Sequence, residues 1–140
     1  MISILPIRVY YEDTDAGGMV YHANYLKFFE RGRVESLREQ GFELTDLLNK
    51  HDAHFVVHSM KIEFLYPARL DQLLYVKTEV IEVRKASIRY NQIAHLEAVE
   101  GRVLCQAEVK LACLDRQDRP RGLPDVLSQE IKSGARSIFN

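Results

Sequence analysis

The hydrophobic pattern of this chain changes its period once, and this change limits the possible folds more than any other feature. From about Asn24 to Gln40 the spacing is helical, and one stripe collects the apolar and small residues Tyr25, Phe28, Phe29, Gly32 and Ser36. From residue 55 onward apolar and polar residues alternate, which is typical of strands with one buried face. A chain with one long helix followed by a series of strands buries that helix against a sheet.

Five stretches carry the strand pattern, one before the helix and four after it. They span residues 3–12, 55–66, 74–81, 87–94 and 103–114, and Pro67 ends the second. The last three are joined by connections of hairpin length, so we expect them to be neighbours in an antiparallel meander. A helix of about 17 residues is ~25 Å long and can cover one face of a five-stranded sheet. The sequence therefore predicts an α+β fold in a single domain over residues 1–140.

Two shorter helices are expected beside this arrangement. Residues 43–50 form a candidate second helix, capped near Thr45 or Asp46. Gly41 suits the C′ position that ends the long helix before it. Residues 125–132 form the other candidate.

The composition excludes several classes of protein. Of the 140 residues, 46% are hydrophobic and 28% are charged, and the formal net charge is -1. This balance gives no electrostatic reason to expect binding to nucleic acid or to a membrane surface. The first residues lack the basic and apolar regions of a signal peptide, and no apolar run is long enough to span a bilayer, so we expect a cytoplasmic protein. An oligomer is also expected, because three apolar residues lie opposite the core set of the last strand: Leu104, Ala112 and Leu114.

The two cysteines, Cys105 and Cys113, fall on the same alternating set of one predicted strand. At ~3.3 Å per residue they lie roughly 26 Å apart, which is beyond the ~7 Å that a disulfide allows. They are expected to be buried thiols, with a catalytic cysteine as the alternative.

Chemically useful residues concentrate where the first strand leads into the long helix. The stretch from Asp13 to Tyr25 reads DTDAGGMVYHANY and holds two acids, a Gly-Gly turn and a histidine. Helix starts expose unpaired N–H groups that favour negative charge, and glycines let the backbone approach a ligand closely. A carboxylate, an imidazole and bare amides together are the parts of an acyl-transfer site.

Each residue of this stretch has a chemical role and a structural alternative. Asp15 can act as a general base on water or attack a carbonyl itself, and the backbone amides of Val20 to His22 can form an oxyanion hole. His22 can hold or protonate a leaving group, or serve only as a structural hydrogen-bonding residue. Tyr11 can orient Asp15 or water, or only pack within a strand. Asp13 is expected to be a helix N-cap.

Other kinds of site do not fit the spacing. His51, His54 and His58 are not placed to share a metal, because the last two lie on a strand and the first precedes it. A calcium loop that starts at Asp13 would need a glutamate where Asn24 stands. The GxSxG elbow, the phosphate-binding loop and the dinucleotide fingerprint are missing from the sequence. We therefore expect no metal and no cofactor.

The stretch YEDTDAGGMVYHANY at residues 11–25 resembles the hotdog-fold 4-hydroxybenzoyl-CoA thioesterase family. It is most similar to the YbgC-like acyl-CoA thioesterase branch, which is often linked to the Tol-Pal system. The likeness continues through FERGR at 29–33 and YPARLD at 66–71, and it covers most of the chain. The resemblance implies a hotdog fold, in which a five-stranded antiparallel sheet wraps a long central helix.

The resemblance also implies the residues of the site. Asp15 matches the catalytic carboxylate of the family, with Tyr11 and His22 in the same site and the oxyanion amide at His22. The family works as dimers with sites at the subunit interface, and these dimers are often paired into tetramers. Coenzyme A is bound in the family between the third and fourth strands, by residues that match Arg84, Lys85 and Ser87.

We therefore expect an acyl-CoA thioesterase that releases a free acid and coenzyme A. One alternative is a thioesterase that acts on acyl groups carried by acyl carrier protein. The other is a non-catalytic acyl-thioester binding or assembly protein linked to the Tol-Pal system, against which the intact Asp15 argues. The sequence leaves open the acyl chain length and whether Asp15 is a base or a nucleophile.

Overall fold

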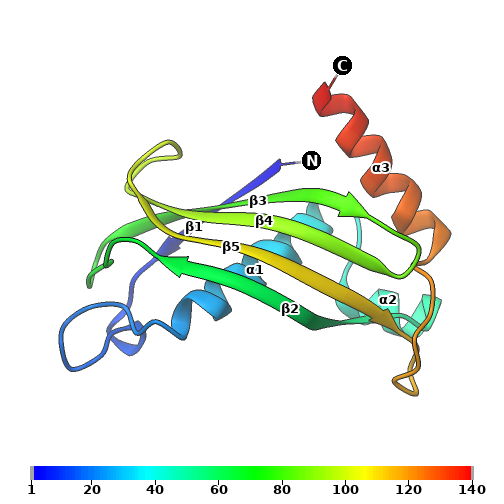
Figure 1. The fold of residues 1–140 in the computed structure, drawn as a ribbon, viewed down its shortest axis with the longest axis horizontal. Coiled ribbons are helices and arrows are strands. Elements are labelled where there is room, and N and C mark those ends of the chain that lie inside the picture. The colour runs from blue at the N-terminus through cyan, green and yellow to red at the C-terminus, as the bar shows by residue number, and fades with distance from the viewer. Residues whose placement is uncertain (1, 140) are drawn as a thin grey trace.

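One antiparallel sheet with a long helix across it makes up most of the computed structural model, which describes residues 2–139 (Figure 1). The elements follow in the order β1 (Ile2–Arg8), a short 3-10 helix (Tyr11–Asp13), α1 (Asn24–Glu39), α2 (Leu44–His51), β2 (His54–Phe64), β3 (Leu73–Val83), β4 (Ser87–Leu96), β5 (Val103–Leu114) and α3 (Asp125–Phe139). Within residues 2–139, no helix combines the length and the apolar character that crossing a membrane would need.

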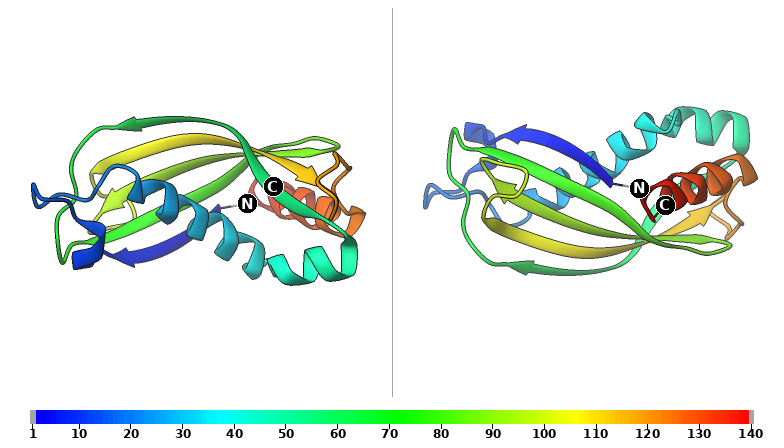
Figure 2. Two further views of the ribbon diagram at one scale, coloured as in Figure 1. Left: turned by 90° about the horizontal axis from the view of Figure 1, so that it is seen from below. Right: turned by 90° about the horizontal axis from the view of Figure 1, so that it is seen from above.

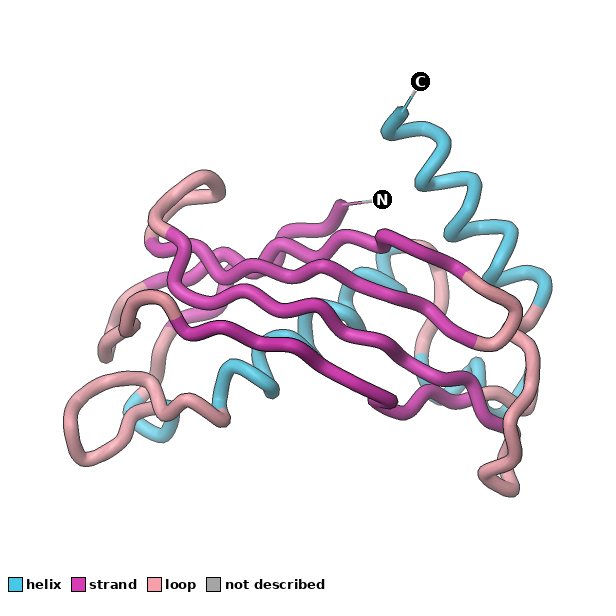
Figure 3. The backbone as a smooth tube through the Cα atoms, in the orientation of Figure 1, coloured by secondary structure: helices cyan, strands magenta, loops and turns pink. Residues whose placement is uncertain are grey.

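The sheet has the strand order β1-β3-β4-β5-β2, and every pairing is antiparallel. The predicted meander is confirmed, because β3, β4 and β5 are neighbours in sequence and in space. β2 does not join β3, which follows it, but pairs with β5, from His54 opposite Leu114 to Phe64 opposite Cys105. β1 and β2 are therefore the two edge strands (Figure 3).

α1 lies across one face of the sheet, and its buried side is the predicted stripe (Figure 2). Gly32 allows the close approach, since a Cβ at this position would lie 2.7 Å from Thr78 Oγ1 and 3.0 Å from Val76 Cγ1. All five stripe residues are buried: Tyr25, Phe28, Phe29, Gly32 and Ser36. The predicted α+β hotdog fold is therefore confirmed.

The end of α1 also follows the prediction. Gly41 has a φ of 92°, and its N–H donates to Arg38 O at 2.9 Å. The N–H of Phe42 donates to Leu37 O at 3.0 Å, which completes a Schellman motif. The chain therefore leaves α1 at the glycine and enters α2 within a few residues.

The first strand is shorter than the predicted range of 3–12. β1 ends at Arg8, which pairs with Leu73, the first residue of β3. Val9 still forms backbone hydrogen bonds with Gln72 and Asp71, which precede β3. The chain leaves the sheet after it, and Tyr11 lies in the 3-10 helix instead of a strand.

The two shorter helices differ from the prediction at their boundaries. α2 begins after Glu43, ahead of the expected cap at Thr45 or Asp46, because the Glu43 carbonyl accepts the first helical hydrogen bond from Leu47 N–H at 3.0 Å. α3 extends beyond residue 132. Its side chains Leu127 and Ile131 are fully buried in the core, which anchors the longer helix.

Leu104 is fully buried and does not contribute to an outer apolar surface, which corrects the expectation for this residue. The register between β4 and β5 shifts beside Ala94 and His95, and Leu104 has no partner on β4. Ala112 and Leu114 are only half-buried, so the apolar surplus on this strand is limited to these two residues.

Candidate active site

The loop between the 3-10 helix and α1 lies at one end of the sheet (Figure 1), and Asp13 anchors it. The buried Asp13 carboxylate accepts hydrogen bonds from Tyr10 N–H at 2.8 Å and from Asn24 Nδ2 at 2.9 Å. Its carbonyl accepts the N–H of Tyr21 at 2.9 Å. The expectation that Asp13 caps the long helix is wrong, because Ala23 occupies the cap position and Asp13 bonds the Asn24 side chain. Asp13 instead ties the loop to the first turn of α1.

Asp15 is exposed and lines a groove. Its Oδ1 accepts hydrogen bonds from Gly17 N–H at 2.9 Å and from Met19 N–H at 3.4 Å. Gly18, with a φ of 78°, closes the turn by donating its N–H to Asp15 O at 3.0 Å. Within the described residues, Oδ2 has no hydrogen-bond partner. One carboxylate oxygen is therefore held and the other is available.

The groove has a volume of about 340 Å³ and lies between the start of α1 and the end of β2. Asp15 and His22 both line it, and Tyr25, Phe64 and Tyr66 supply aromatic walls. The His22 ring meets the Phe64 ring edge-on, with 5.9 Å between centroids. The structure thus brings together two of the three predicted catalytic residues.

Tyr25 is a neutral wall of this groove and not a candidate base. Burial raises the pKa of its phenol to about 12, and a hydrogen bond with the Ala68 backbone offsets part of that rise. The pKa far above neutrality keeps the hydroxyl protonated.

The backbone amides of the loop are not equally available. Val20 N–H donates to Ala68 O at 2.8 Å and Tyr21 N–H donates to Asp13 O at 2.9 Å, so these two amides are occupied. Among the residues that the structure describes, His22 N–H and Ala23 N–H have no acceptor. Of the predicted oxyanion amides, the structure leaves only that of His22 free, at the entry to α1.

Tyr11 lies outside the groove. Its side chain is 82% exposed in the 3-10 helix, and it is not among the residues that line the cavity. Within one protomer the structure does not bring the Tyr11 phenol to Asp15 and His22.

The three predicted coenzyme A residues lie together in and beside the turn between β3 and β4. Arg84 N–H donates to Ser87 O at 2.9 Å, and the Arg84 guanidinium forms an ion pair with Glu82. Lys85 O accepts the N–H of Leu123 at 2.8 Å. This turn is at the opposite end of the sheet from the loop that carries Asp15 (Figure 1). One protomer therefore does not bring the two groups of residues together.

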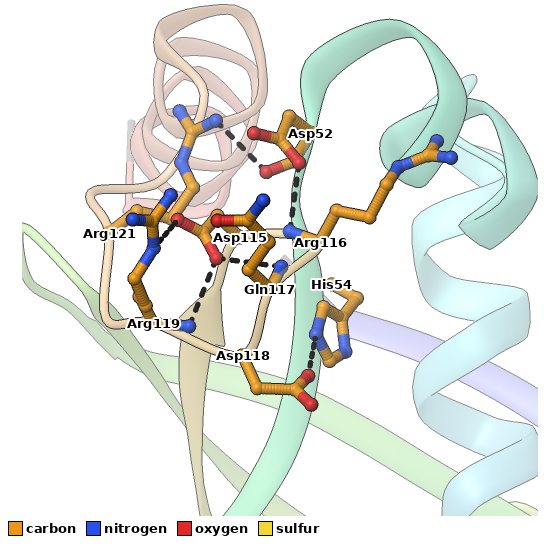
Figure 4. A network of polar contacts seen from close by, with 8 residues as sticks. All are labelled: Asp52, His54, Asp115, Arg116, Gln117, Asp118, Arg119 and Arg121. Atoms are coloured by element: carbon orange, nitrogen blue, oxygen red, sulfur yellow. Dashed lines mark hydrogen bonds and ion pairs between the residues drawn. The ribbon is translucent and has the colours of Figure 1, made fainter.

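Other cations near this turn are engaged by the protein (Figure 4). The loop after β5 is fastened to the start of β2, where His54 Nε2 lies 3.0 Å from Asp118 Oδ1. The Arg119 guanidinium bonds the Asp115 carboxylate. The guanidinium groups of Arg116 and Arg121 donate to the backbone carbonyls of Leu48 and His51, and the backbone N–H of Arg116 donates to the Asp52 carboxylate. Among the described side chains, Lys85 makes no ion pair, so its ammonium group is available to a ligand.

Cys105 and Cys113 are free and buried, as predicted. Burial raises the pKa of both thiols, that of Cys105 to about 12. A thiol with so high a pKa is a poor nucleophile, which argues against the alternative of a catalytic cysteine. Residues 2–139 contain no group of three or more His, Cys, Asp or Glu side chains arranged to hold a metal ion.

The sequence analysis did not single out Phe64 and Tyr66 as site residues. They end the alternating pattern just before Pro67, and such a pattern reports only which face of a strand a residue occupies. Two exposed aromatic residues directly before a strand-ending proline were the available signal.

Comparisons with known proteins agree with this geometry. A family model described as thioesterase superfamily matches residues 17–105. The acyl-CoA thioester hydrolase YbgC of Escherichia coli O6:H1 is 44% identical over 128 residues, which cover 91% of this chain and 93% of the relative. The acyl-CoA thioesterase YbgC of Haemophilus influenzae is 49% identical over 110 residues, or 79% of each chain. The crystal structure of a probable thioesterase from Bartonella henselae matches with a TM-score of 0.83 and 39% identity, covering 89% of this chain and 100% of that one.

Proposed function

Because this chain belongs to the thioesterase superfamily and is a thioester hydrolase, we propose that it hydrolyses acyl-CoA to a free acid and coenzyme A, with Asp15 at the centre of the reaction. The observation that carries this proposal is the shared groove. Asp15 and His22 both line it, and the N–H of His22 has no partner among the described residues.

Each residue of the groove has its own role in the proposed hydrolysis. The free N–H groups of His22 and Ala23 polarise the thioester carbonyl and stabilise the oxyanion that forms on it. Asp15 either takes a proton from the attacking water or attacks the carbonyl carbon itself. When the tetrahedral intermediate collapses, the carbon–sulfur bond breaks and the coenzyme leaves as a thiolate. If Asp15 is the nucleophile, the acyl group remains on it as a mixed anhydride, which water then hydrolyses to the free acid and the Asp15 carboxylate. His22 supplies or orients the proton that this thiolate takes up.

The coenzyme requires a second copy of the chain. Arg84, Lys85 and Ser87 lie at the far end of the sheet from Asp15, so a bound acyl-CoA would contact both groups only in a dimer. β2 is a free edge strand, and antiparallel pairing of two β2 strands would place the turn of one protomer at the Asp15 end of the other. We propose such a homodimer, further paired into a tetramer. Both cysteines are free, which suits the reducing cytoplasm that we propose as its location.

The first prediction tests Asp15 directly. Asp15→Asn keeps the size of the side chain and its ability to accept hydrogen bonds from Gly17 and Met19, but it removes the charge. We expect kcat to fall by at least ~10²-fold, the lower range for losing general base catalysis, while folding and acyl-CoA binding persist. Steady-state hydrolysis of short, long and aromatic acyl-CoA thioesters measures this. Glu12→Gln, at an exposed carboxylate in the 3-10 helix just before this loop, serves as the matched control and should keep wild-type kcat.

The same assay separates the alternatives. A folded Asp15→Asn protein that keeps more than half of the wild-type kcat would remove Asp15 from the chemistry and direct attention to Glu30 or His22. Faster hydrolysis of acyl groups on acyl carrier protein than on coenzyme A would favour the carrier-protein alternative. Tight acyl-CoA binding without turnover of any substrate would favour the non-catalytic assembly protein linked to the Tol-Pal system.

A further inference from the structure

A second groove follows the same seam between α1 and β2, farther toward the C-terminal end of the helix. It has a volume of about 260 Å³. Its walls are mostly apolar and include Leu37, Phe55, Val57 and Leu111, and its polar members are Glu30 and Arg33. Apolar walls with a few fixed polar groups are typical of a small-molecule site.

Arg33 is an unusual member of this lining, because its side chain is buried without a carboxylate partner. The residue is 6% exposed, and its Nη1 donates one hydrogen bond, to Gln92 Oε1 at 3.0 Å. Gln92 is itself held by the Phe29 carbonyl and Thr78, so it cannot turn to offer a second acceptor. Within the described residues no ion pair involves Arg33. Burial lowers the pKa of the Arg33 guanidinium, and the charge of Glu30, which is exposed at the groove and makes no ion pair with it, offsets part of that change.

Tyr90 is another buried polar residue within range of the Arg33 charge, although it is not among the residues that line the groove. Its hydroxyl is completely buried and has no hydrogen-bond partner among residues 2–139. Burial raises the pKa of this phenol, and the nearby positive charge of Arg33 counters part of the rise. A buried guanidinium that has one neutral hydrogen-bond partner and no ion pair is costly to hold away from water, and such a group calls for an explanation.

We propose that this second groove binds the free carboxylate at the far end of an acyl group, so that the enzyme prefers acyl-CoA substrates with an ω-carboxyl group. This inference rests on the proposed function. A guanidinium presents several N–H groups in a plane and pairs well with a carboxylate, and within the described residues only one of the Arg33 N–H groups is used, on Gln92. The apolar walls suit the methylene groups of the chain. Both grooves are lined in part by β2 or by the residues directly after it, and β2 is the edge strand that the proposed dimer would pair.

The test compares substrates that differ only at the far end of the acyl chain. Hexanoyl-CoA is paired with adipoyl-CoA, octanoyl-CoA with suberoyl-CoA, and decanoyl-CoA with sebacoyl-CoA. We expect kcat/KM of the wild-type enzyme to favour the carboxylated member at one or more lengths by ~10-fold or more, as expected for a hydrogen-bonded ion pair. Equal or lower kcat/KM for the carboxylated member at every length would overturn the inference, while hydrolysis of the plain substrates would leave the proposed function intact.

Three variants assign the preference to this groove. Arg33→Met should abolish the preference and leave kcat/KM for plain substrates near wild type. Arg31→Met removes an exposed arginine from the same helix and should change neither quantity. Arg33→Lys keeps the positive charge but loses the planar set of donors, so it should lower the preference several-fold. If Arg33→Met fails to fold, as thermal unfolding will show, Arg33→Lys still decides, because an undiminished preference in it would count against the site.

A binding measurement keeps the inference independent of turnover. Calorimetric titration of Asp15→Asn with the same substrate pairs should show tighter binding of the carboxylated member, and this difference should shrink in the double variant with Arg33→Lys. Equal Kd values for both members of every pair would overturn the carboxylate site even if the enzyme hydrolysed all of them. Absence of hydrolysis together with a difference in Kd would instead contradict the proposed function alone.

Discussion

At the scale of single residues, Tyr11 belongs to the site according to the motif, but in one protomer it lies outside the groove. We predict that Tyr11→Phe keeps kcat within about twofold of wild type, because the side chain is 82% exposed and outside the groove, and exposed side chains away from a site have small effects. Steady-state hydrolysis of the best acyl-CoA substrate measures this, with Tyr10→Phe, another exposed tyrosine, as the control. A tenfold fall in kcat for Tyr11→Phe alone would place its hydroxyl in the site of the assembled enzyme.

The same loop shows how far the site could be predicted from residue types. The sequence places Asp13 and Asp15 in one motif, and the resemblance selects Asp15, but spacing alone cannot tell which carboxylate is buried. That difference arises from the Asn24 amide and the Tyr10 N–H, which converge on Asp13 only after the chain leaves β1. The amides of Val20 and Tyr21 are occupied for a similar reason, because their acceptors come from Ala68 and from Asp13 across the loop. Periodicity carries no information on such contacts.

At the scale of elements, the contact between α1 and the sheet depends on Gly32. We predict that Gly32→Ala lowers the free energy of unfolding by about 1–3 kcal/mol, since the new methyl group would overlap Thr78 and Val76 in a packed interior. Alanine favours a helix over glycine by up to about 1 kcal/mol, so the overlap has to exceed that gain. Urea unfolding measures the change, with the exposed Arg31→Ala as the control. A Gly32→Ala protein more stable than wild type would show that the helix can move away from the sheet at little cost.

The elements themselves were largely predictable, and their long-range pairing was not. The stripe on α1 and the β3-β4-β5 meander follow from local periodicity and short connections. The pairing of β2 with β5 is different, because it joins segments far apart in the chain and has no local signature. The alternation of polar and apolar residues does not reveal a bulge either. The register shift beside Ala94 and His95 accounts for the burial of Leu104 in the core.

At the scale of the whole molecule, the coenzyme site should respond to charge without affecting chemistry. We predict that replacing Arg84 and Lys85 together with Ala raises KM severalfold and leaves kcat nearly unchanged, because phosphate contacts stabilise the bound substrate and the transition state alike. The increase should shrink as salt is added, since exposed charges are screened within ~10 Å at 0.1 M. Initial rates at low and high ionic strength measure both effects, with the exposed Lys27→Ala and Arg31→Ala pair as the control. An unaltered KM at low salt would move the coenzyme to another part of the surface.

The edge strand β2 gives the sharpest test of the assembly. β2 is 11 residues long, its outer edge is unpaired among the described residues, and Val57 on it is 51% exposed. Long unpaired edges with exposed apolar residues readily pair with another strand, and a lysine at such an edge opposes pairing.

We predict that the wild-type protein is a dimer or tetramer at micromolar concentration and that Val57→Lys shifts it toward the monomer, as measured by light scattering. Ile81→Lys is the matched control, because Ile81 is 48% exposed but lies at the bulge of β3, away from the free edge of β2. If Ile81→Lys dissociates the protein and Val57→Lys does not, the copies meet through the outer face of the sheet. A wild-type monomer that hydrolyses acyl-CoA at the full rate would contradict the assembly itself, since Asp15 and Arg84 would then act from opposite ends of a single sheet.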